Sequence, residues 1–332
     1  LMAAGLMNFI PSLISDSGPF GLSAHPVTHS MIDNIEGSFY AFLIAIIIIY
    51  SGSLVWKERE SKIDEIIDAT PHPTAISYLS KFCSLSVIVL IIQLLCIATS
   101  ISVQLAKGFT DVRPDVYLKT MIGINYTRFL MLIVLSMTMH AFINNKYIAF
   151  FAFVVFLLLN NFLWMFLEVD SNMVQFSASP QYKYSDMTGY GPYVPGIVWF
   201  RVYWGIFAVL LALISIFAWN RGREFQFSKK LNAIKEGFRH SSLKMVVGLI
   251  LAWLLTAGFV FYNTQVLNPY KTKDQETAAS VDYEKQYKKY ERLVQPRVTD
   301  VVYHIDLYPE DRRVKIDGVL TLKNKSNVSI DS

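Results

Sequence analysis

Six apolar stretches of about twenty residues each restrict the fold of this chain more than any other feature. They lie roughly at 37–56, 82–106, 121–143, 147–167, 197–219 and 243–262. A helix needs about 20 apolar residues to cross the hydrocarbon core of a bilayer. Core helices of soluble proteins keep a polar stripe, which these runs lack. The sequence therefore predicts an all-α polytopic membrane bundle of about six transmembrane helices.

The composition of the chain agrees with a membrane location for most of its length. Of 332 residues, 53 % are apolar and 17 % are charged, whereas a soluble domain carries about 25 % charged residues. These values exclude a disordered chain and disfavour a water-soluble globular enzyme. The net charge of +4 is too small to indicate nucleic-acid binding. We therefore expect the lipid bilayer, and no nucleic acid, as a partner.

The basic residues between the apolar runs predict the orientation of the chain. The loops at 57–81, 144–146 and 220–242, with the adjacent Lys244, hold 12 Lys and Arg residues. The loops on the other side, at 1–36, 107–120 and 168–201, hold 6 when the adjacent Arg128 is included. Cytoplasmic loops carry the excess of positive charge, which places the first set of loops in the cytoplasm. The run 243–262 then leads outward, and the tail after it is predicted to be periplasmic.

The first cytoplasmic loop is predicted to form a short amphipathic helix. Residues 57–73 read KERESKIDEIIDATPHP, with three isoleucines at helical spacing. Residues 57–68 contain five acidic and three basic side chains. A helix that lies on anionic lipid is usually basic. This acidic helix therefore favours a basic protein partner over a plain connector on the membrane surface.

This loop resembles the coupling element of the ABC-2 type exporter permeases. The resemblance rests on Trp56–Glu60, the acidic helix, Ala69–Pro71 and Lys81. In that family the loop docks on the ATPase subunit that drives transport. The residues to which the resemblance assigns ATPase coupling are Glu58, Arg59, Glu60, Asp64, Glu65 and Pro71.

The same resemblance implies the surroundings of the chain. It implies a permease of the bacterial inner membrane whose partners are an ABC ATPase subunit and a second permease half or an identical copy. It also implies that the chain is a piece of a longer protein, with one further span before Leu1 that completes a six-helix unit ending near Trp219.

Motifs for catalysis are absent from the sequence. The chain contains no GxxxxGK[ST], the loop that cradles nucleotide phosphates, so ATP would bind to the separate ATPase subunit. HPVTH at 25–29 has proline where a zinc-protease helix needs its glutamate. We expect no cofactor, no metal and no catalytic residue in this chain itself.

Polar residues inside the apolar runs are the candidates for a translocation path. Gln93, Asn160 and Asn161 interrupt two of the runs. Polar groups at membrane depth usually face a bundle interior or a water-filled path, and hydrogen bonding between helices is the alternative. The sequence favours neither for these three residues. For the serines and threonines of the runs we expect hydrogen bonds between helices, namely for Ser84, Ser86, Thr99, Ser100, Ser136 and Thr138.

The loop at 170–196 has no helix or strand pattern. A loop of this length is either functional or ordered by packing. In exporter permeases a re-entrant element often precedes the last span, so the resemblance places an outer gate here, with Tyr184, Asp186 and Tyr190 as its candidate residues. An interfacial aromatic loop is the alternative.

The tail after the last apolar run changes from a helical to an alternating pattern. Residues 264–280 read as a polar linker, and 281–293 as a charged helix with its tyrosines on one face. Alternate apolar residues then share one face of a strand at 301–307 and of a second strand at 314–322. This pattern predicts an antiparallel hairpin with one buried face. Two strands alone are marginally stable, so we expect partner strands beyond Ser332.

The hairpin resembles the opening of the N-terminal β-sandwich of M1-family zinc aminopeptidases. The resemblance rests on Tyr303, Asp306, Pro309, Gly318 and Asn324. Some bacterial proteins, notably in Bacteroidetes, join an ABC-2 permease to such a peptidase domain. The resemblance implies the beginning of an extracytoplasmic antiparallel β-sandwich, with zinc belonging to a domain downstream, because HExxH does not occur in this chain.

These patterns divide the chain into regions and leave two functions open. The regions are an extracytoplasmic loop 1–36, a permease bundle 37–219 with the coupling loop 57–81, a basic cytoplasmic loop 220–242, an additional span 243–262, a linker with a charged helix 263–298 and the first hairpin of a truncated β-domain 299–332. The first function is the membrane-spanning part of an ABC-type exporter, with ATP hydrolysed by a separate subunit. The second is the membrane anchor of a periplasmic M1-like zinc aminopeptidase.

Overall fold

The computed structural model describes residues 25–167, 169, 171–219, 227–240, 243–268, 273–311 and 313–330. Most of the predicted loop 1–36, and the beginning of the basic loop 220–242, lie outside the described residues. The chain divides into two units, a helical unit (Leu1–Tyr270) and a second unit (Lys271–Ser332).

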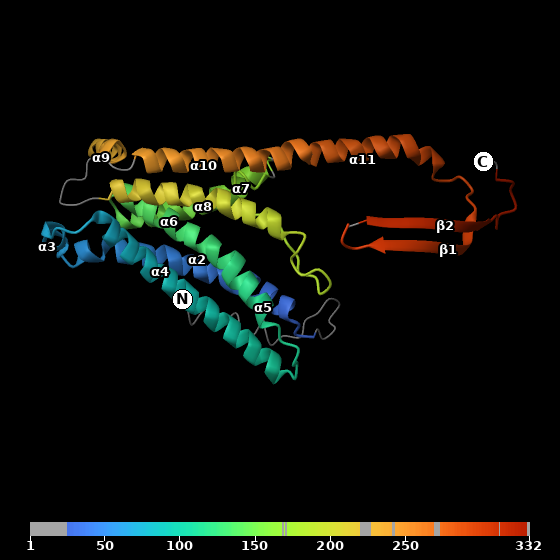
Figure 1. Ribbon diagram of the computed structural model, residues 1–332, viewed down its shortest axis with the longest axis horizontal. Coiled ribbons are helices and arrows are strands. Elements are labelled where there is room, and N and C mark those ends of the chain that lie inside the picture. Colours follow the sequence, from blue (N-terminus) through green and yellow to red (C-terminus); the bar gives the residue numbers. More distant parts are fainter. Residues whose placement is uncertain are drawn as a thin grey trace. The chain divides into compact units, whose positions relative to one another are not determined.

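The described part of the helical unit contains six helices that are long and apolar enough to span a membrane (Figure 1). They are α2 (Thr28–Glu60), α4 (Thr74–Ala106), Pro114–Phe142, α7 (Lys146–Phe166), α8 (Val194–Phe217) and Leu243–Leu267. Two of these helices change type along their length. Pro114–Phe142 comprises α5 (Pro114–Tyr117), the π-helix η2 (Leu118–Tyr126) and α6 (Thr127–Phe142), and Leu243–Leu267 comprises α10 (Leu243–Phe261) and the π-helix η3 (Tyr262–Leu267). The six predicted membrane helices are confirmed.

Two helices begin earlier than their apolar runs. α2 and α4 have 33 residues each, or about 50 Å at 1.5 Å per residue, against a hydrocarbon core of about 30 Å. α2 therefore begins within the region 1–36 that the sequence predicted as a loop. The additional residues from Thr28 to Glu36, about two and a half turns, are helical because Met31, Ile32 and Ile35 are buried against the bundle.

Short-range signals set other helix ends. The side chain of Asn145 accepts hydrogen bonds from the backbone N–H groups of Tyr147 (2.9 Å) and Ile148 (3.1 Å) and so caps α7. Pro195 lies in the first turn of α8. Backbone N–H groups in the first turn have no acceptor within the helix, so proline, which lacks this group, is tolerated there.

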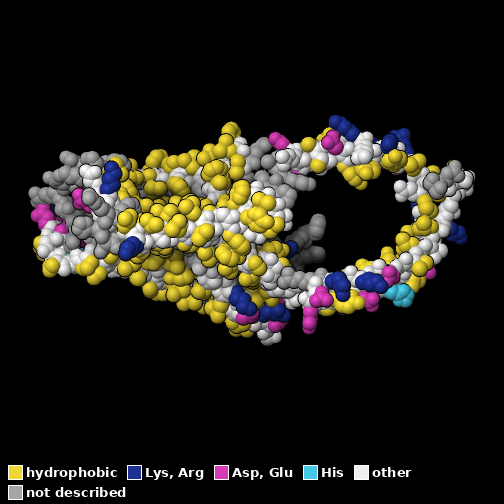
Figure 2. All heavy atoms as spheres, turned by 45° about the horizontal axis from the view of Figure 1, so that its top comes forward, with side chains coloured by type: hydrophobic (Ala, Val, Ile, Leu, Met, Phe, Trp, Pro, Cys, Tyr) yellow, Lys and Arg dark blue, Asp and Glu magenta, His cyan; other side chains and the backbone are white. Residues whose placement is uncertain are grey.

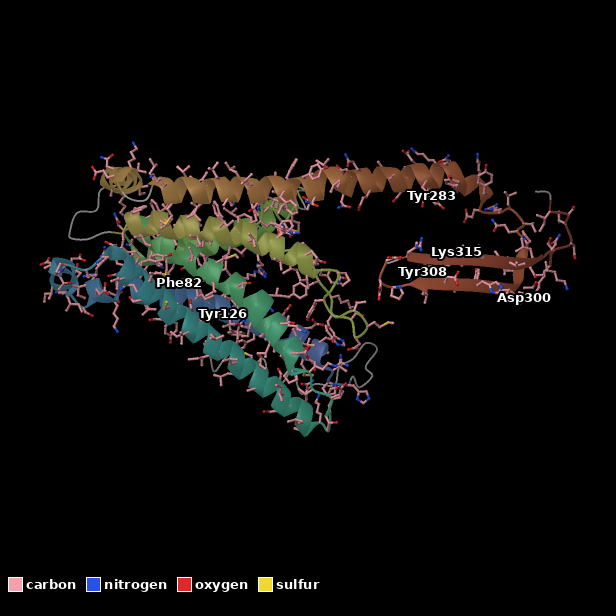
Figure 3. All side chains as sticks on the ribbon, in the orientation of Figure 1. Phe82, Tyr126, Tyr283, Asp300, Tyr308 and Lys315 are labelled. Carbon is pink, nitrogen blue, oxygen red and sulfur yellow. The ribbon has the colours of Figure 1, made fainter. Side chains whose placement is uncertain are left out.

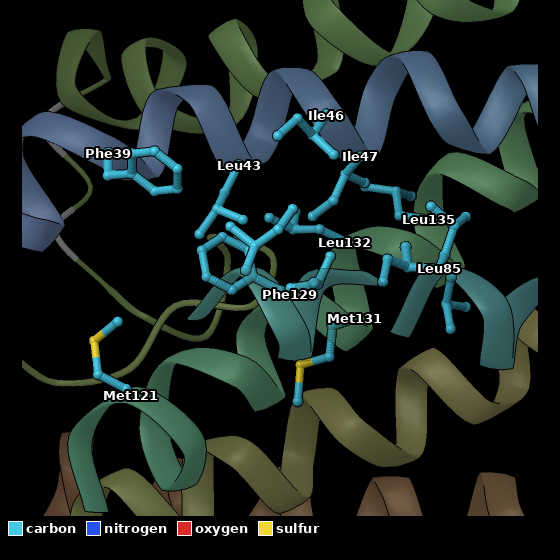
Figure 4. Packing of buried hydrophobic residues seen from close by; sticks show 14 of the residues in the cluster. Phe39, Leu43, Ile46, Ile47, Leu85, Met121, Phe129, Met131, Leu132 and Leu135 are labelled. Atoms are coloured by element: carbon cyan, nitrogen blue, oxygen red, sulfur yellow. The ribbon is translucent and has the colours of Figure 1, made fainter. Parts of the chain in front are cut away.

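α6 lies at the centre of the bundle. It packs against α2, α4, α7 and α8, and α10 packs against α8. Figure 4 shows Phe39, Leu43 and Ile47 of α2 beside Phe129 and other residues of α6. These side chains are almost completely buried.

Hydroxyl groups connect the helices within this core. The Oγ atoms of Ser51 in α2 and Ser136 in α6 lie 2.5 Å apart. Ser215 Oγ of α8 donates to Thr138 Oγ1 of α6 at 2.7 Å. The expected hydrogen bonds between helices are thus present for Ser136 and Thr138, whereas the side chains of Ser84, Ser86 and Thr99 donate to carbonyls of their own helix α4.

The π-helix η2 forms the first part of a membrane helix. π-Helices are rare and occur often at functional sites. Thr120 and Asn125 of η2 are buried. The hydroxyl of Tyr126 donates to the Ser86 carbonyl of α4 at 3.1 Å, and Figure 3 labels this tyrosine. η2 therefore brings polar groups into the bundle at one end.

The outer surface of the helical unit is apolar. Figure 2 shows hydrophobic side chains gathered over the helical body. In α7 only Ala149 and Phe153 are buried, and Phe151 and Phe166 are largely exposed. A soluble monomer rarely exposes so large an apolar area, so this surface is suited to contact with lipid.

The second unit contains a helix and a hairpin. α11 (Lys273–Tyr287) is followed by the 3₁₀-helix η4 (Lys288–Tyr290) and by β1 (Arg297–Tyr308) and β2 (Arg313–Lys323). Residues 264–280, which the sequence indicated as a polar linker, are largely helical, because η3 and α11 occupy most of this segment. The tyrosine stripe of the charged helix is present, with ring centroids of Tyr283 and Tyr287 4.7 Å apart.

The antiparallel hairpin has the predicted faces. Tyr303 pairs with Gly318, and Ile305 pairs with Ile316. The face expected to be buried is exposed in the described residues, with Ile305 53 % exposed, because two strands offer nothing to cover it. The β-sandwich stays a prediction.

We expect Gly52→Ala to destabilise the bundle. A Cβ at Gly52 would meet the ring of Phe150, which itself packs on His140 at 5.1 Å between centroids. Overpacking of this kind costs about 1–3 kcal/mol, so the melting temperature in detergent should fall. The control is Gly37→Ala in the same helix, where a Cβ meets nothing within 4 Å. An equal effect of the two substitutions would contradict the packing of α7 on α2.

Candidate functional site

The two ends of the helical unit differ in their polar groups. The α3 end comprises the carboxyl end of α2, the short helix α3 (Asp64–Ala69), the start of α4, the turn before α7 and α9 (Phe227–His240). The cavity end comprises the first turns of α2, α5 with η2, the loop 171–193 and the start of α8.

The predicted coupling helix is shorter than the pattern indicated. α2 continues to Glu60, and Lys62 then takes a left-handed conformation with φ 57°, as residues that end helices often do. α3 covers only six residues and none is buried. Ile66 is 71 % exposed, so α3 presents an apolar side chain among acidic ones.

Ion pairs attach this end of α2 to two other helices. Glu58 pairs with Lys81 of α4, whose side chain is buried. Glu60 pairs with Lys146 of α7 at 2.8 Å. The guanidinium of Arg59 lies 5.0 Å from the ring centroid of Trp56. The first two carboxylates, which the resemblance assigned to partner docking, are thus engaged within the chain.

The other residues that the resemblance assigned to coupling lie in α3 or next to it. Asp64 and Arg59 line a small recess with Asp68 and Trp219, and Glu65 is exposed. Exposed Pro71 lies between Thr70 and His72, whose side chains approach to 2.8 Å.

His72 also links this segment to α4. Its Nε2 lies 2.8 Å from Ser77 Oγ. α9 is attached at the same end, where Lys230 Nζ donates to the carbonyls of Ala141 (2.8 Å) and Phe142 (3.1 Å). These carbonyls belong to the end of α6, where a positive charge is favoured.

A polar cavity of about 830 Å³ occupies the cavity end. Residues of α2, η2, α6, the loop and α8 line it. The charged members are Asp33, Glu36, Arg128, Lys183 and Arg201, together with His29.

Glu36 is the best-connected carboxylate in this cavity. Its Oε1 accepts hydrogen bonds from Asn125 Nδ2 (2.8 Å) and from the Tyr182 hydroxyl (3.3 Å). Burial and the neighbouring Glu36 raise the pKa of Tyr182, and burial raises that of Tyr190. Both hydroxyls therefore stay protonated near neutral pH, and the Tyr190 oxygen lies 2.6 Å from Thr120 Oγ1.

The candidate gate residues lie on the loop over this cavity. Tyr184 and Tyr190 line it, with ring centroids 5.3 Å apart. Asp186 does not line it and pairs with Arg113 at 3.4 Å. Arg113 Nη1 also donates to the Tyr184 hydroxyl at 3.0 Å, and this bond raises the arginine pKa. The described residues between α7 and α8 contain no re-entrant helix.

The candidate path residues are not brought together. Gln93 of α4 is fully buried, and neither polar atom of its amide has a partner among the described residues. Asn160 Oδ1 of α7 accepts from the Phe176 backbone at 2.7 Å and anchors the loop. Asn161 is exposed and donates to the Leu157 carbonyl of its own helix at 2.9 Å. A path through all three remains a prediction.

Sequence reasoning did not find Glu36, Asn125 or Tyr182. These residues are far apart in the chain, and Glu36 lay in a predicted loop. The one available signal was an acidic residue directly before an uncharged run of twenty residues. Comparison of the chain with protein-family models, with curated proteins and with solved structures gave no match.

We expect Gln93→Leu to raise the melting temperature in detergent, because a buried unpaired amide costs about 1–3 kcal/mol. Gln104→Leu on the same helix is the control. Gln104 is equally buried but donates to the Pro26 carbonyl at 2.7 Å and accepts from the Tyr117 hydroxyl at 2.9 Å. Its replacement should lower the melting temperature. A loss of stability in Gln93→Leu as large as in Gln104→Leu would show that Gln93 is paired.

Proposed function

We propose that this chain is the membrane-spanning permease part of an ABC-type exporter in a bacterial inner membrane. ATP is hydrolysed by a separate subunit that docks on α3, and a second permease half or an identical copy completes the transporter. The tail after α10 lies in the periplasm.

The attachment of α3 is the observation that carries the proposal. α3 has no buried residue, so the bundle does not need it for its own packing. The segments on either side of it are nevertheless fixed, through Glu58 to Lys81 and through His72 to Ser77. An exposed helix held by fixed connections is suited to receiving a force from a partner and passing it to α2 and α4.

The charge on this segment specifies the kind of partner. Glu65 and Ile66 are exposed on α3, and acidic residues outnumber basic ones over 57–68. A basic surface with an apolar recess complements this combination, because charges steer the encounter and the apolar contact supplies affinity.

The polar cavity supports the transport part of the proposal. It lies at the end of the bundle opposite α3, since α2 begins there and ends at α3. In the proposed mechanism, movement of α3 displaces the carboxyl end of α2 together with the ends of α4 and α7, to which the Glu58 and Glu60 ion pairs attach it. The shift alters the cavity, where Glu36 of α2 contacts Tyr182 of the loop.

We expect Ile66→Ser to weaken capture of the ATPase subunit at least about tenfold, since truncation of a central apolar contact costs about 1–2 kcal/mol or more. The measurement is co-purification of the full chain with its candidate ATPase and the ATP hydrolysis of the complex. Val281→Ser is the control, because this exposed apolar residue lies on α11 outside the membrane bundle. Unchanged capture and unchanged ATP hydrolysis in Ile66→Ser would remove α3 from the mechanism.

The second candidate function is the anchoring of a periplasmic M1-like zinc aminopeptidase domain. The uncovered apolar face of the hairpin favours it, because such a face is suited to further strands. In this case the helices hold the peptidase at the membrane and no substrate crosses.

The two functions predict different responses to the same substitution. For an anchor, peptide hydrolysis by the longer protein should proceed without any ATPase and stay unchanged in Ile66→Ser. For an exporter, ATP-dependent transport into vesicles should be lost in that variant. If ATP-dependent transport persists in Ile66→Ser while peptide hydrolysis falls, both assignments are contradicted.

A further inference from the structure

A second, apolar groove adjoins the polar cavity. It has a volume of about 700 Å³ and lies between α8 and the helix formed by η2 and α6. Its apolar lining includes Val194, Val198 and Val202 of α8, at a spacing of four residues, with Ile124 and Met131 opposite.

The groove and the cavity share part of their lining. Tyr184, Tyr190 and Arg201 border both. Arg201 Nη1 donates to the Ser177 carbonyl at 2.8 Å, and its Nε atom is buried without a partner among the described residues. One space with charged walls thus continues into another with apolar walls.

The charged walls carry both signs. Asp33 and Glu36 lie in α2, and Arg128, Lys183 and Arg201 come from α6, the loop and α8. Asn125 and Tyr182 both donate to Oε1 of Glu36. Among the described residues no hydrogen bond is directed to Oε2 of Glu36, so this oxygen can accept one from a ligand. This arrangement can accept N–H donors at the carboxylates and an anion at the guanidinium and ammonium groups.

The length of the uncharged run that follows Glu36 places the cavity at the level of the lipid headgroups. Residues 37–56 of α2 carry no charge and extend about 30 Å, the thickness of the hydrocarbon core. Glu36 directly precedes this run and therefore lies at its outer boundary. Arg201 likewise precedes the uncharged remainder of α8. Val194 and Val198 of the groove are 45 % and 50 % exposed on the apolar outer surface.

We propose that the cavity and groove together bind one phospholipid whose headgroup carries a phosphate and a primary ammonium. The ammonium donates to Glu36 and Asp33, the phosphate lies at Arg201, Arg128 and Lys183, and one acyl chain occupies the groove. A purely anionic headgroup would be repelled by the two carboxylates. A quaternary ammonium has no N–H to donate to Glu36.

A second copy of the chain accounts less well for these observations. Its apolar surface would cover the groove but would leave the mixed charges of the adjoining cavity without a counterpart. The proposal does not depend on coupling to an ATPase, because it concerns binding alone.

The test is native mass spectrometry of the full chain released from vesicles that contain phosphatidylethanolamine, phosphatidylcholine and phosphatidylglycerol in equal amounts. We expect one phosphatidylethanolamine retained per chain. In Val198→Trp, where the indole fills the groove, its retention should fall at least about tenfold. Val209→Trp is the matched control, because Val209 is 49 % exposed on the same helix and does not line the groove.

A second pair of variants tests the headgroup. Glu36→Gln keeps an acceptor for Asn125 and Tyr182 but removes the charge, so the preference for phosphatidylethanolamine should fall about tenfold. Asp111→Asn is the control, because this exposed carboxylate does not line the cavity.

Three outcomes would overturn the proposal. The first is retention of several lipids with no headgroup preference, which indicates annular lipid only. The second is equal retention in Val198→Trp and Val209→Trp. The third is a dimer of the chain that Val198→Trp dissociates, which would assign the groove to a second copy.

Discussion

The exclusion of water from the bilayer core is the constraint on which this structure depends. Every backbone N–H and C=O there must be satisfied within its own helix, and the six apolar runs meet this requirement as helices. In lipid there is little hydrophobic driving force for helices to associate with each other. Close packing around α6 and hydroxyl contacts such as that between Ser51 and Ser136 hold them together. Charged and strongly polar groups are consequently concentrated at the two ends.

The two ends use their polar groups differently. At the α3 end, Glu58 and Glu60 connect α2 to α4 and α7, and α3 has no buried residue. At the cavity end, Glu36 accepts hydrogen bonds from Asn125 and Tyr182, and the three residues line a cavity of about 830 Å³. The α3 end is therefore joined to neighbouring helices by ion pairs, and the cavity end holds a hydrogen-bonded carboxylate beside a polar cavity.

The helix α2 is common to both proposals. It carries Glu36 near one terminus and Glu58 near the other, and it is continuous from Thr28 to Glu60. A rigid helix transmits a displacement along its length without changing its own hydrogen bonds. A force applied at α3 would thus reach the loop beside the cavity through α2. A lipid bound in the cavity would in turn affect the displacement of α2.

The sequence by itself determined the six membrane helices, the two strands with their faces, and Tyr184 and Tyr190 as aromatic residues of the long loop before α8. These features depend on hydrophobic runs, on the two-residue alternation of strands and on local composition. Only the tertiary structure decided that α2 extends to Thr28, that Lys81 and Lys146 pair with the acidic residues of the coupling segment, and that Glu36, Asn125 and Tyr182 meet. The physical reason is that these contacts join residues from 23 to 146 positions apart, and local periodicity carries no information about which helices lie side by side.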